Sequence, residues 1–578
     1  MSIERDFSTV CYPHAAVHSR SCPGMSLHGT AERANMNEHS RTLVWLSVAV
    51  AIVTTLTVAC SKVAVETGSH RQSGVLRIST RRFDNLNTVV SAGGSSVYLA
   101  YLWGAFLFVS DDMMRFVPEL ATSIPTRANG GVSTDGLTVT YHLRRGVTWH
   151  DGAPFTASDV IFTWHVIMNP ANNVVTRIGY DKISSITAPD AYTLVVRLKQ
   201  PYAPIVANFF GPGEVPYVIL PRHLLGGLSD INHASYNRKP IGTGPFIIQS
   251  YDPDAGVVLA ANPRYWRGKP KLQGIQYRIV PDANTEMVML RADEIDVAAV
   301  SDTHAQELKD APGIVIVSEP APQNTFLSLN VRRPPLDDVR VRRAIAMTVD
   351  RSFFVRAFQF GAGSVDDGDE PPFYWAYDPR AHMPSYDPQA AGQLLDAAGW
   401  RRDPASGYRS KAGKPLHLIF AYITNRDPDT RYAPVFQNAM KQIGIAVDLR
   451  NYPYNIFYAP ASEGGVLNGG GYDVAMSGWV LGSDPDEATL WMCDQYPPLG
   501  YNWSFFCDPR LDALEATALS SYDRDVRRRA YWQIQELLAR DVPAVFVSWV
   551  NIIYATRDTV RDFHPGESWV ASWDWRKE

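Results

Sequence analysis

Apolar and polar residues alternate in several short stretches of the chain, and this alternation predicts β-strands. One stretch spans residues 137–143, where the apolar positions are Leu137, Val139, Tyr141 and Leu143. A period of two is typical of a strand with one buried face and one solvated face. The same alternation predicts strands over residues 194–198 and 275–279.

Other stretches repeat their apolar residues at helical spacing. Thr156 stands three residues before Asp159, which is the spacing of a capping box. The helix that begins there is expected to end before Pro170, because proline cannot continue a helix. A strand over 137–143 followed by this helix predicts a strand–loop–helix unit.

Two more helices have an apolar stripe that predicts a packed face. The first is expected to be capped by Asp387, to begin with Pro388 and to end at Gly399. Its expected buried residues are Ala391, Leu394, Leu395 and Ala398. Those of the second are Val341, Ala344, Ile345 and Thr348. Helices and strands mixed along the chain indicate an α/β fold.

His150 and Asp151 lie between the predicted strand and the predicted helix, and we interpret them as part of a structural turn. No His-Glu-x-x-His, Gly-x-Ser-x-Gly or clustered Cys/His pattern occurs in the chain. The glycine-rich stretches 241–246 and 463–473 lack the complete dinucleotide and phosphate-loop patterns, so we interpret both as turns. We expect no catalytic residue, no metal and no cofactor.

Composition and charge fit a globular protein of several lobes. The chain has 578 residues, 46% of them hydrophobic and 20% charged, and a net charge of −5. This length exceeds what one core accommodates. No basic stripe alternates with an aromatic platform, which argues against nucleic-acid binding. We expect the solvated face of a helix to contain Arg340, Arg342, Arg343 and Arg351.

An uncharged run of 17 residues, 43–59, precedes Cys60. It is slightly short for a membrane-spanning helix and slightly long for the core of a signal peptide. It resembles a bacterial lipoprotein signal, in which the cysteine becomes the lipidated first residue, although Thr57 stands where leucine is usual. A lipidated Cys60, a cleaved soluble export signal and an uncleaved anchor stay open. Each places residues 61 onward outside the cytoplasm.

The regions around this run have separate interpretations. Residues 36–59 form a natural signal peptide that starts at Met36, so residues 1–35 are either untranslated or an extended region before it. Residues 60–73 are polar and without periodicity, which is typical of a tether. We expect the protein at the periplasm or cell surface, anchored to the membrane by lipid.

Cys493 and Cys507 are the cysteines of the exported body. An oxidising compartment favours a disulfide between them, and two free thiols are the alternative. Closing a loop of about 15 residues would contribute roughly 3 kcal/mol.

Many segments in order resemble the family 5 extracytoplasmic solute-binding proteins, which serve ABC importers of the peptide and nickel class. They include PELA at 118–121, residues 135–164 around TWHDGAPFTASDV, and IGTGPF at 241–246. Others are NPRYWRGKP at 262–270, DEIDV at 293–297, and the segments 329–351, 386–400 and 472–479. The resemblance covers nearly the whole chain from about residue 74.

The resemblance implies a two-lobed clamp of the type II periplasmic-binding-protein class, with three α/β domains. Domain I is expected to be discontinuous, comprising residues 74–115, 222–320 and 552–578. Domain II would then be 116–221, and domain III 322–551. The protein is expected to be a monomer that encloses a solute between its lobes and delivers it to an ABC permease with its ATPase subunits.

The segment GWVLGSDPDEATL is the candidate ligand site. Peptide-binding relatives usually have an aspartate three residues after Trp479, where it pairs with the ammonium group of the ligand, and Gly482 stands there in this chain. We expect Trp479, Gly482, Ser483, Asp484 and Asp486 to line the cleft, with Asp484 as the replacement carboxylate. The alternative is that residues 483–486 form only a turn.

Three other functions stay open at this point. The ligand can be a non-peptide solute such as an oligosaccharide or a metal chelate. A sensor lipoprotein could keep the fold without a transporter. An exported hydrolase would need a triad assembled in space, for which no local signature is present.

Overall fold

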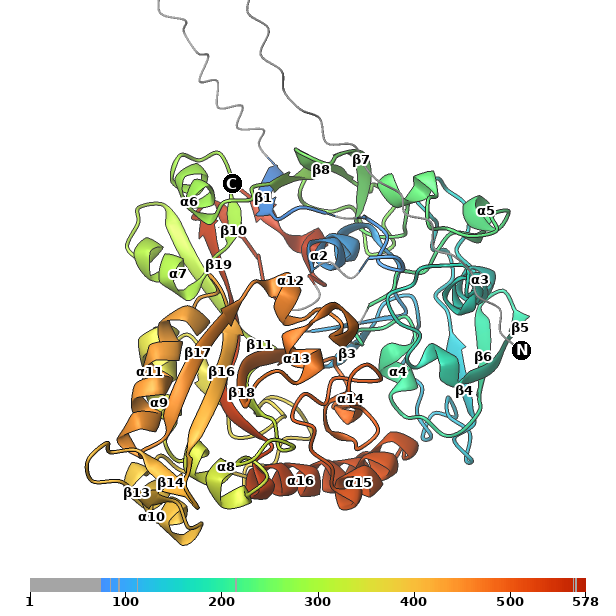
Figure 1. Cartoon of the computed structure of the whole chain (residues 1–578). Coiled ribbons are helices and arrows are strands. Elements are labelled where there is room, and N and C mark those ends of the chain that lie inside the picture. Colours follow the sequence, from blue (N-terminus) through green and yellow to red (C-terminus); the bar gives the residue numbers. More distant parts are fainter. Residues whose placement is uncertain are drawn as a thin grey trace, which may run out of the picture. The chain divides into compact units, whose positions relative to one another are not determined.

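The computed structural model describes residues 74–578, except 84, 92, 93, 112, 214, 215, 565, 567 and 568. A mixed sheet of 11 strands runs through this part of the chain (Figure 1). In spatial order its strands are β17 (Ala446–Tyr452), β16 (His417–Ile423), β18 (Val474–Val480), β11 (Ile314–Leu329), β19 (Ala544–Arg557), β10 (Val297–Ala299), β1 (Val75–Thr80), β9 (Gly274–Ile279), β8 (Gly256–Ala261) and β7 (Phe246–Asp252), with β12 (Ser364–Val365) paired to β19. The α/β class is confirmed.

The long antiparallel strands β11 and β19 connect the two halves of this sheet. Their pairing is interrupted: Pro320 lies opposite Asn551, but the next paired residue of β11 is Asn324, opposite Trp549. Extra residues on one strand break the hydrogen-bond ladder and bend the strand locally. The irregularity falls where we predicted that domain I gives way to domain III. Those boundaries stay a prediction.

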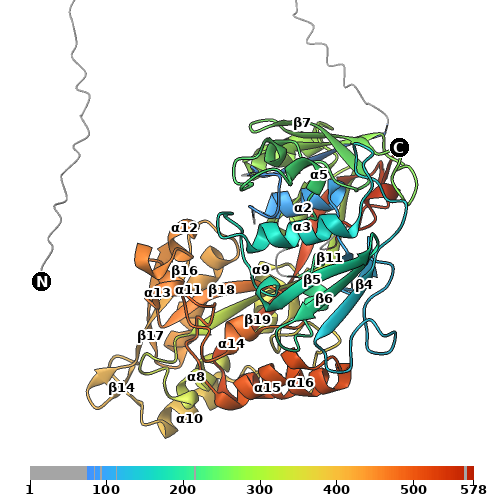
Figure 2. The ribbon, with the colours of Figure 1, turned by 90° about the vertical axis from the view of Figure 1, so that its right-hand side faces the viewer.

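The half that contains β1 also packs against a small sheet of β4 (Thr138–His142), β6 (Thr193–Leu198) and β5 (Ile183–Asp190), beside which Figure 2 shows α3. Its helices are α2 (Gly94–Trp103), α3 (Ala157–Met168), α4 (Ile205–Asn208), α5 (Arg222–Leu225), α6 (Ala283–Arg291) and α7 (Asp302–Leu308). Its shorter elements are β2 (Phe108–Ser110), β3 (Phe116–Pro118), η1 (Tyr180–Lys182), η2 (Ser235–Arg238), β20 (Val560–Arg561), η4 (Ser572–Asp574) and β21 (Arg576–Lys577).

The other half packs its helices around β16, β17 and β18 and has a core of its own. Its helices are α8 (Val339–Ala346), α9 (Arg351–Phe358), α10 (Pro388–Ala397), α11 (Asp429–Gln442), α12 (Tyr454–Phe457), α13 (Val466–Gly469), α14 (Ala488–Trp491), α15 (Pro509–Ser520) and α16 (Arg524–Asp541). Its remaining elements are β13 (Arg401–Arg402), β14 (Arg409–Lys411), β15 (Lys414–Pro415) and η3 (Ala461–Glu463).

The predicted elements are confirmed where the signal is local. Strands β6 and β9 cover two of the predicted stretches, and β4 covers the third except for one residue at each end. Helix α3 begins with the predicted capping box of Thr156 and Asp159, and the Asp387 carboxylate caps α10 by accepting a hydrogen bond from the Ala390 amide at 2.9 Å. The four predicted contact positions of the α8 region, 341, 344, 345 and 348, are all buried.

One expectation about α8 is wrong. Arg342 does not lie on a solvated face but is buried, and its guanidinium donates to the carbonyl oxygens of Leu336, Asp541 and Val542. Burial lowers the pKa of this guanidinium, and the carboxylate of Asp541 opposes that effect. Arg342 thereby fixes α8 against the end of α16, because it satisfies carbonyl groups that the helix end leaves unpaired.

His150 is a structural residue, as the sequence predicts. Its Nε2 lies 3.1 Å from the Gly244 oxygen, and its Nδ1 accepts a hydrogen bond from the Gly242 amide. Burial lowers its pKa to about 4, so the ring is neutral at neutral pH. The stretch 241–246 is accordingly a scaffold turn. A Cβ atom at Gly242 would lie 1.8 Å from the Trp103 oxygen, which explains the glycine.

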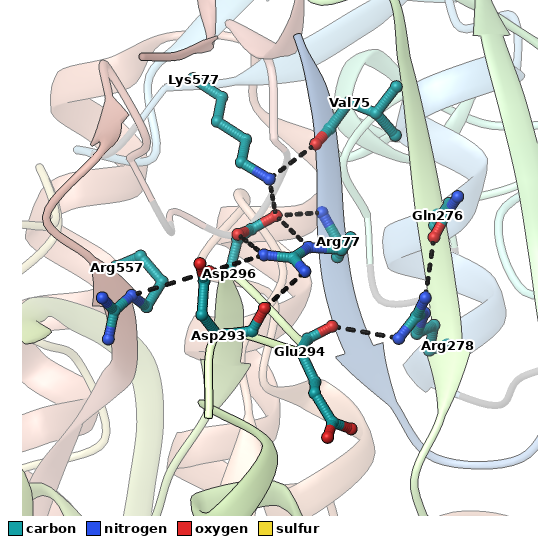
Figure 3. A network of polar contacts seen from close by, with 9 residues as sticks. All are labelled: Val75, Arg77, Gln276, Arg278, Asp293, Glu294, Asp296, Arg557 and Lys577. Atoms are coloured by element: carbon teal, nitrogen blue, oxygen red, sulfur yellow. Dashed lines mark hydrogen bonds and ion pairs between the residues drawn. The ribbon is translucent and has the colours of Figure 1, made fainter. Parts of the chain in front are cut away.

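A polar network joins the first strand of the described region to its last residues (Figure 3). The fully buried Asp296 accepts hydrogen bonds from Arg77 at 2.6 Å and from the Lys577 ammonium at 2.8 Å. Lys577 also donates to the Val75 oxygen at 3.1 Å. Burial alone would raise the pKa of Asp296, but the hydrogen bonds from the two cations lower it. The network ties β1, β10 and β21 together.

Candidate functional site

A cavity of about 570 Å³ lies between two groups of segments that are distant in the sequence. One group comprises lining residues from 113–127 and from 203–206. The other comprises residues 373–375, 483–484 and lining residues from 522–527. Most of the first group belongs to predicted domain II, and the second belongs to predicted domain III. The volume is within the range of ligand pockets.

Aromatic side chains form much of the cavity wall, and guanidinium groups lie against them. Phe373, Tyr374 and Trp375 follow one another in the second group. The guanidinium carbon of Arg524 lies 4.9 Å from the centre of the Trp375 ring. A cation over a ring face is attracted by the electron density of the ring. The wall therefore combines flat apolar surfaces with positive charge.

Asp484 lines this cavity but already has a cationic partner. Arg527, in the first turn of α16, donates one hydrogen bond to Asp484 at 2.8 Å and a second one to the other carboxylate oxygen. Both side chains are about 9% exposed. Burial alone would lower the pKa of Arg527, and the Asp484 carboxylate raises it well above its usual value. Asp484 therefore already has a counter-charge, and its role as the replacement carboxylate stays a prediction.

Ser483 also lines the cavity. It is 4% exposed, and its hydroxyl group has no hydrogen-bond partner among the described residues. Its amide donates to the Pro212 oxygen at 3.0 Å, which links the two sides of the cavity through the backbone. A buried hydroxyl without a partner is costly, so a ligand that bonded to it would remove that cost.

The other three predicted site residues are not part of the cavity lining. Trp479 packs on Tyr501 and Trp503 at ring distances of 5.1 and 5.9 Å. The carbonyl group of Gly482 accepts a hydrogen bond from the Tyr374 hydroxyl. Asp486 is half-buried and accepts a hydrogen bond from the Tyr202 hydroxyl at 3.2 Å. Gly482 and Asp486 support wall residues, and the structure brings only Ser483 and Asp484 into the cavity.

A cluster of buried carboxyl groups lies behind the Asp484–Arg527 pair. Burial raises the pKa of Asp369 to about 7 and that of Asp486 to about 6. Burial and neighbouring carboxylates also raise the pKa values of Glu370 and Glu515 well above the usual range. Neither oxygen of Glu515 has a hydrogen-bond partner among the described residues. Glu370 and Glu515 are therefore held in their protonated form more strongly than Asp369 and Asp486.

The arginine residues of the cavity escaped the sequence prediction. Residues 524–529 contain five charged side chains, and this pattern alone does not say which of them face a cavity. Arg127 belongs to a loop before β4, far from α16 in the sequence. Arg524 and Arg527 are three residues apart, and this spacing places them on one side of a helix. It is the one sequence feature that indicates a shared direction for the two side chains.

The disulfide between Cys493 and Cys507 is present in the structure, in the segment that follows α14. Within the described residues, no group of three or more His, Cys, Asp or Glu side chains is arranged to hold a metal ion. In the same part of the chain, no helix combines the length and the apolar character needed to cross a membrane. Cys60, the predicted lipidation site, lies outside the described residues.

Comparison with known proteins identifies the family. A family model described as "Bacterial extracellular solute-binding proteins, family 5 Middle" matches residues 115–498. The chain belongs to this family. The oligopeptide-binding protein AppA of Bacillus subtilis is 27% identical over 508 residues, which cover 86% of this chain and 90% of that protein. Di/tripeptide-binding protein 1 of Pseudomonas aeruginosa is 28% identical over 457 residues, which cover 75% of this chain and 81% of that protein.

Solved structures of the same family share the fold. AppA from Bacillus subtilis in complex with a nonapeptide has a TM-score of 0.71 and 25% identity, and the match covers 87% of this chain and 99% of that one. NikZ from Campylobacter jejuni in complex with Ni(L-His) has a TM-score of 0.74 and 23% identity, and the match covers 87% of this chain and 100% of that one. The clamp fold that the sequence resemblance implied is thereby confirmed.

Proposed function

We propose that this protein is the solute-binding component of an ABC importer and that it encloses a peptide or peptide-like solute. The cavity between the segments of predicted domains II and III carries the proposal. Its volume of about 570 Å³ suits a small ligand. Its aromatic walls can gain affinity by excluding water, and the charged groups among them can orient a polar ligand. The relatives named for oligopeptides and di- or tripeptides support peptides as the solute class.

Release and capture require the lobes to move, and β11 and β19 provide the connection. The interrupted pairing around Pro320 and Asn324 marks a point where these strands bend most easily. Hinge closure that uses a few residues at the ends of elements is common among proteins that enclose a ligand. We place the hinge there, and the closed form then presents the solute to the permease.

The proposed location is the outer side of the cytoplasmic membrane or the cell surface. Residues 36–59 would direct export, and a lipid on Cys60 would hold the protein at the membrane through the tether 60–73. One lipid chain gives weak, reversible binding, so several acyl chains are required for stable anchoring. Binding and delivery, without turnover of the solute, complete the proposal.

The direct test is binding of peptides to the purified protein. Native mass spectrometry after incubation with mixed di- to nonapeptides identifies the bound species, and calorimetry measures its affinity. The matched variants are Trp375→Ala, in the cavity wall, and Trp532→Ala, on α16 outside the lining. We expect only Trp375→Ala to weaken binding. Intact recovery of the peptide separates binding from hydrolysis, and the absence of any bound peptide would refute the proposal.

A further inference from the structure

The charged groups of the cavity do not balance. Its described lining has four arginine residues, Arg115, Arg127, Arg524 and Arg527, and one carboxylate, Asp484. Asp484 neutralises Arg527, and Asp111, outside the lining, pairs with Arg115 at 2.7 Å. Arg127 and Arg524 form no ion pair or hydrogen bond with any described residue. The carboxylates of Asp523 and Asp525, outside the lining, act on Arg127 and Arg524 only at longer range. The cavity therefore has two guanidinium groups that no described carboxylate contacts directly.

These two groups come from opposite sides of the cavity and are held by aromatic rings. The Arg127 guanidinium carbon lies 5.9 Å from the centre of the Tyr522 ring, and Arg524 lies over Trp375. Burial lowers the pKa of Arg524; the charges of Arg528 and Arg527 add to this effect, and the carboxylate of Asp525 opposes it. A positive group with other cations nearby gains from an anion that enters the cavity.

The hydroxyl group of Ser483 is an independent sign of a ligand. Ser483 is more than nine-tenths buried, lines the same cavity, and lacks a hydrogen-bond partner for its Oγ among the described residues. A hydroxyl group can donate a hydrogen bond to a carboxylate. Two guanidinium groups and one free hydroxyl form a set of donors. No carboxylate of the described lining is free to receive an ammonium group.

We infer that the cavity recognises its ligand through a carboxylate group and not through an ammonium group. This inference rests on the proposed function and specifies the ligand end that determines affinity. Arg127 and Arg524 bind the carboxylate of the peptide, and Ser483 donates the additional hydrogen bond. The apolar body of the ligand lies against the aromatic wall. A peptide with a blocked amino end remains a ligand, and one with a blocked carboxyl end does not.

The test uses an equimolar library of tripeptides of Ala, Leu and Phe in four forms: free, N-acetylated, C-amidated and blocked at both ends. We expect the N-acetylated form to keep its affinity within about threefold. The C-amidated form should lose about ten- to hundredfold, the effect of one or two charge-assisted hydrogen bonds. Arg127→Gln and Arg524→Gln should weaken binding of the free acid by a similar factor and leave binding of the amide unchanged.

Arg529→Gln is the matched control, because Arg529 is an exposed residue of the same helix outside the cavity lining. It should change neither affinity. Arg127 and Arg524 are also exposed, so their substitution leaves the free energy of unfolding intact. If the acid and the amide bind equally well, the inference is overturned while the proposed function stands.

If none of the four forms binds, the peptide function fails, and simple anions then decide the inference. Citrate, succinate and inorganic phosphate are added separately to the wild-type protein and to the double variant Arg127→Gln/Arg524→Gln. A rise in melting temperature that a carboxylate produces and that disappears in the double variant supports the site. A response to phosphate alone, an equal response in both proteins, or no response refutes it.

Discussion

Replacing Asp484 by Asn is expected to destabilise the protein even without ligand, because Arg527 would stay buried with no full counter-charge. Removing one partner of a buried ion pair costs about 3–5 kcal/mol. The Nε of Arg527 already lacks a hydrogen-bond partner among the described residues. The guanidinium also interacts electrostatically with Glu370 and Glu515, and ionisation of either would recover part of the loss. We therefore expect a loss of about 3 kcal/mol in the free energy of unfolding.

Equilibrium unfolding in urea, followed by tryptophan fluorescence and circular dichroism, measures this loss. Asp562→Asn is the matched control, since Asp562 pairs with Arg576 at 2.6 Å but both side chains are largely exposed. An exposed pair contributes at most about 1 kcal/mol. The double variant Asp484→Asn/Arg527→Met should regain most of the stability, because it removes the buried charge as well. If Asp484→Asn destabilises the protein no more than Asp562→Asn does, the buried ion pair does not contribute the expected stability.

Three further predictions concern protonation, the disulfide and the lipid. Burial raises the pKa of Asp369 to about 7, so its contribution to stability is present in acid and is lost as the pH rises through that value. The free energy of unfolding contributed by Asp369 is therefore larger at pH 5 than at pH 8. Asp369→Asn should remove this difference, which is on the order of 2–3 kcal/mol. The low pKa of His150 acts in the opposite direction but equally in both proteins, and identical pH profiles would contradict the prediction. Replacing Cys493 and Cys507 together by Ser should lower the unfolding free energy by about 3 kcal/mol, and peptide mapping without reduction should recover the linked peptides rather than two alkylated thiols. Intact-mass measurement of protein from the membrane fraction should show a mature chain that begins at an acylated Cys60, and a Cys60→Ser variant that still has the lipid would exclude this site.

Local features of the fold could be predicted from the sequence. The strand around residue 139, the capping box of Thr156 and the helix that begins at Pro388 each depend on neighbours within a few residues. We predicted a structural role for His150 because the sequence contains no motif that would supply it with a catalytic partner. These elements are specified by periodicity and by capping chemistry, both of which are readable without tertiary contacts.

Pairings between distant residues could not be predicted in the same way. Asp484 and Arg527 are 43 positions apart, and their meeting depends on how α16 packs against the segment after β18. Arg342 is buried because the end of α16 and the segment before α8 supply carbonyl groups at its position, which no charge pattern reveals. The cavity is assembled from separate segments, so only its two residues within a motif of the family, Ser483 and Asp484, could be proposed in advance.

The network around Asp296 also determines how the protein can be handled. Lys577 contacts both Val75 and Asp296, so the last residues of the chain lie beside the first strand of the described region. If the carboxyl end is coupled to a biosensor surface, the described region is therefore attached at the edge where residue 74 also lies. Such a surface reproduces the proposed attachment through the amino-terminal side without requiring a lipid. A bulky carboxyl-terminal fusion, by contrast, would crowd that edge.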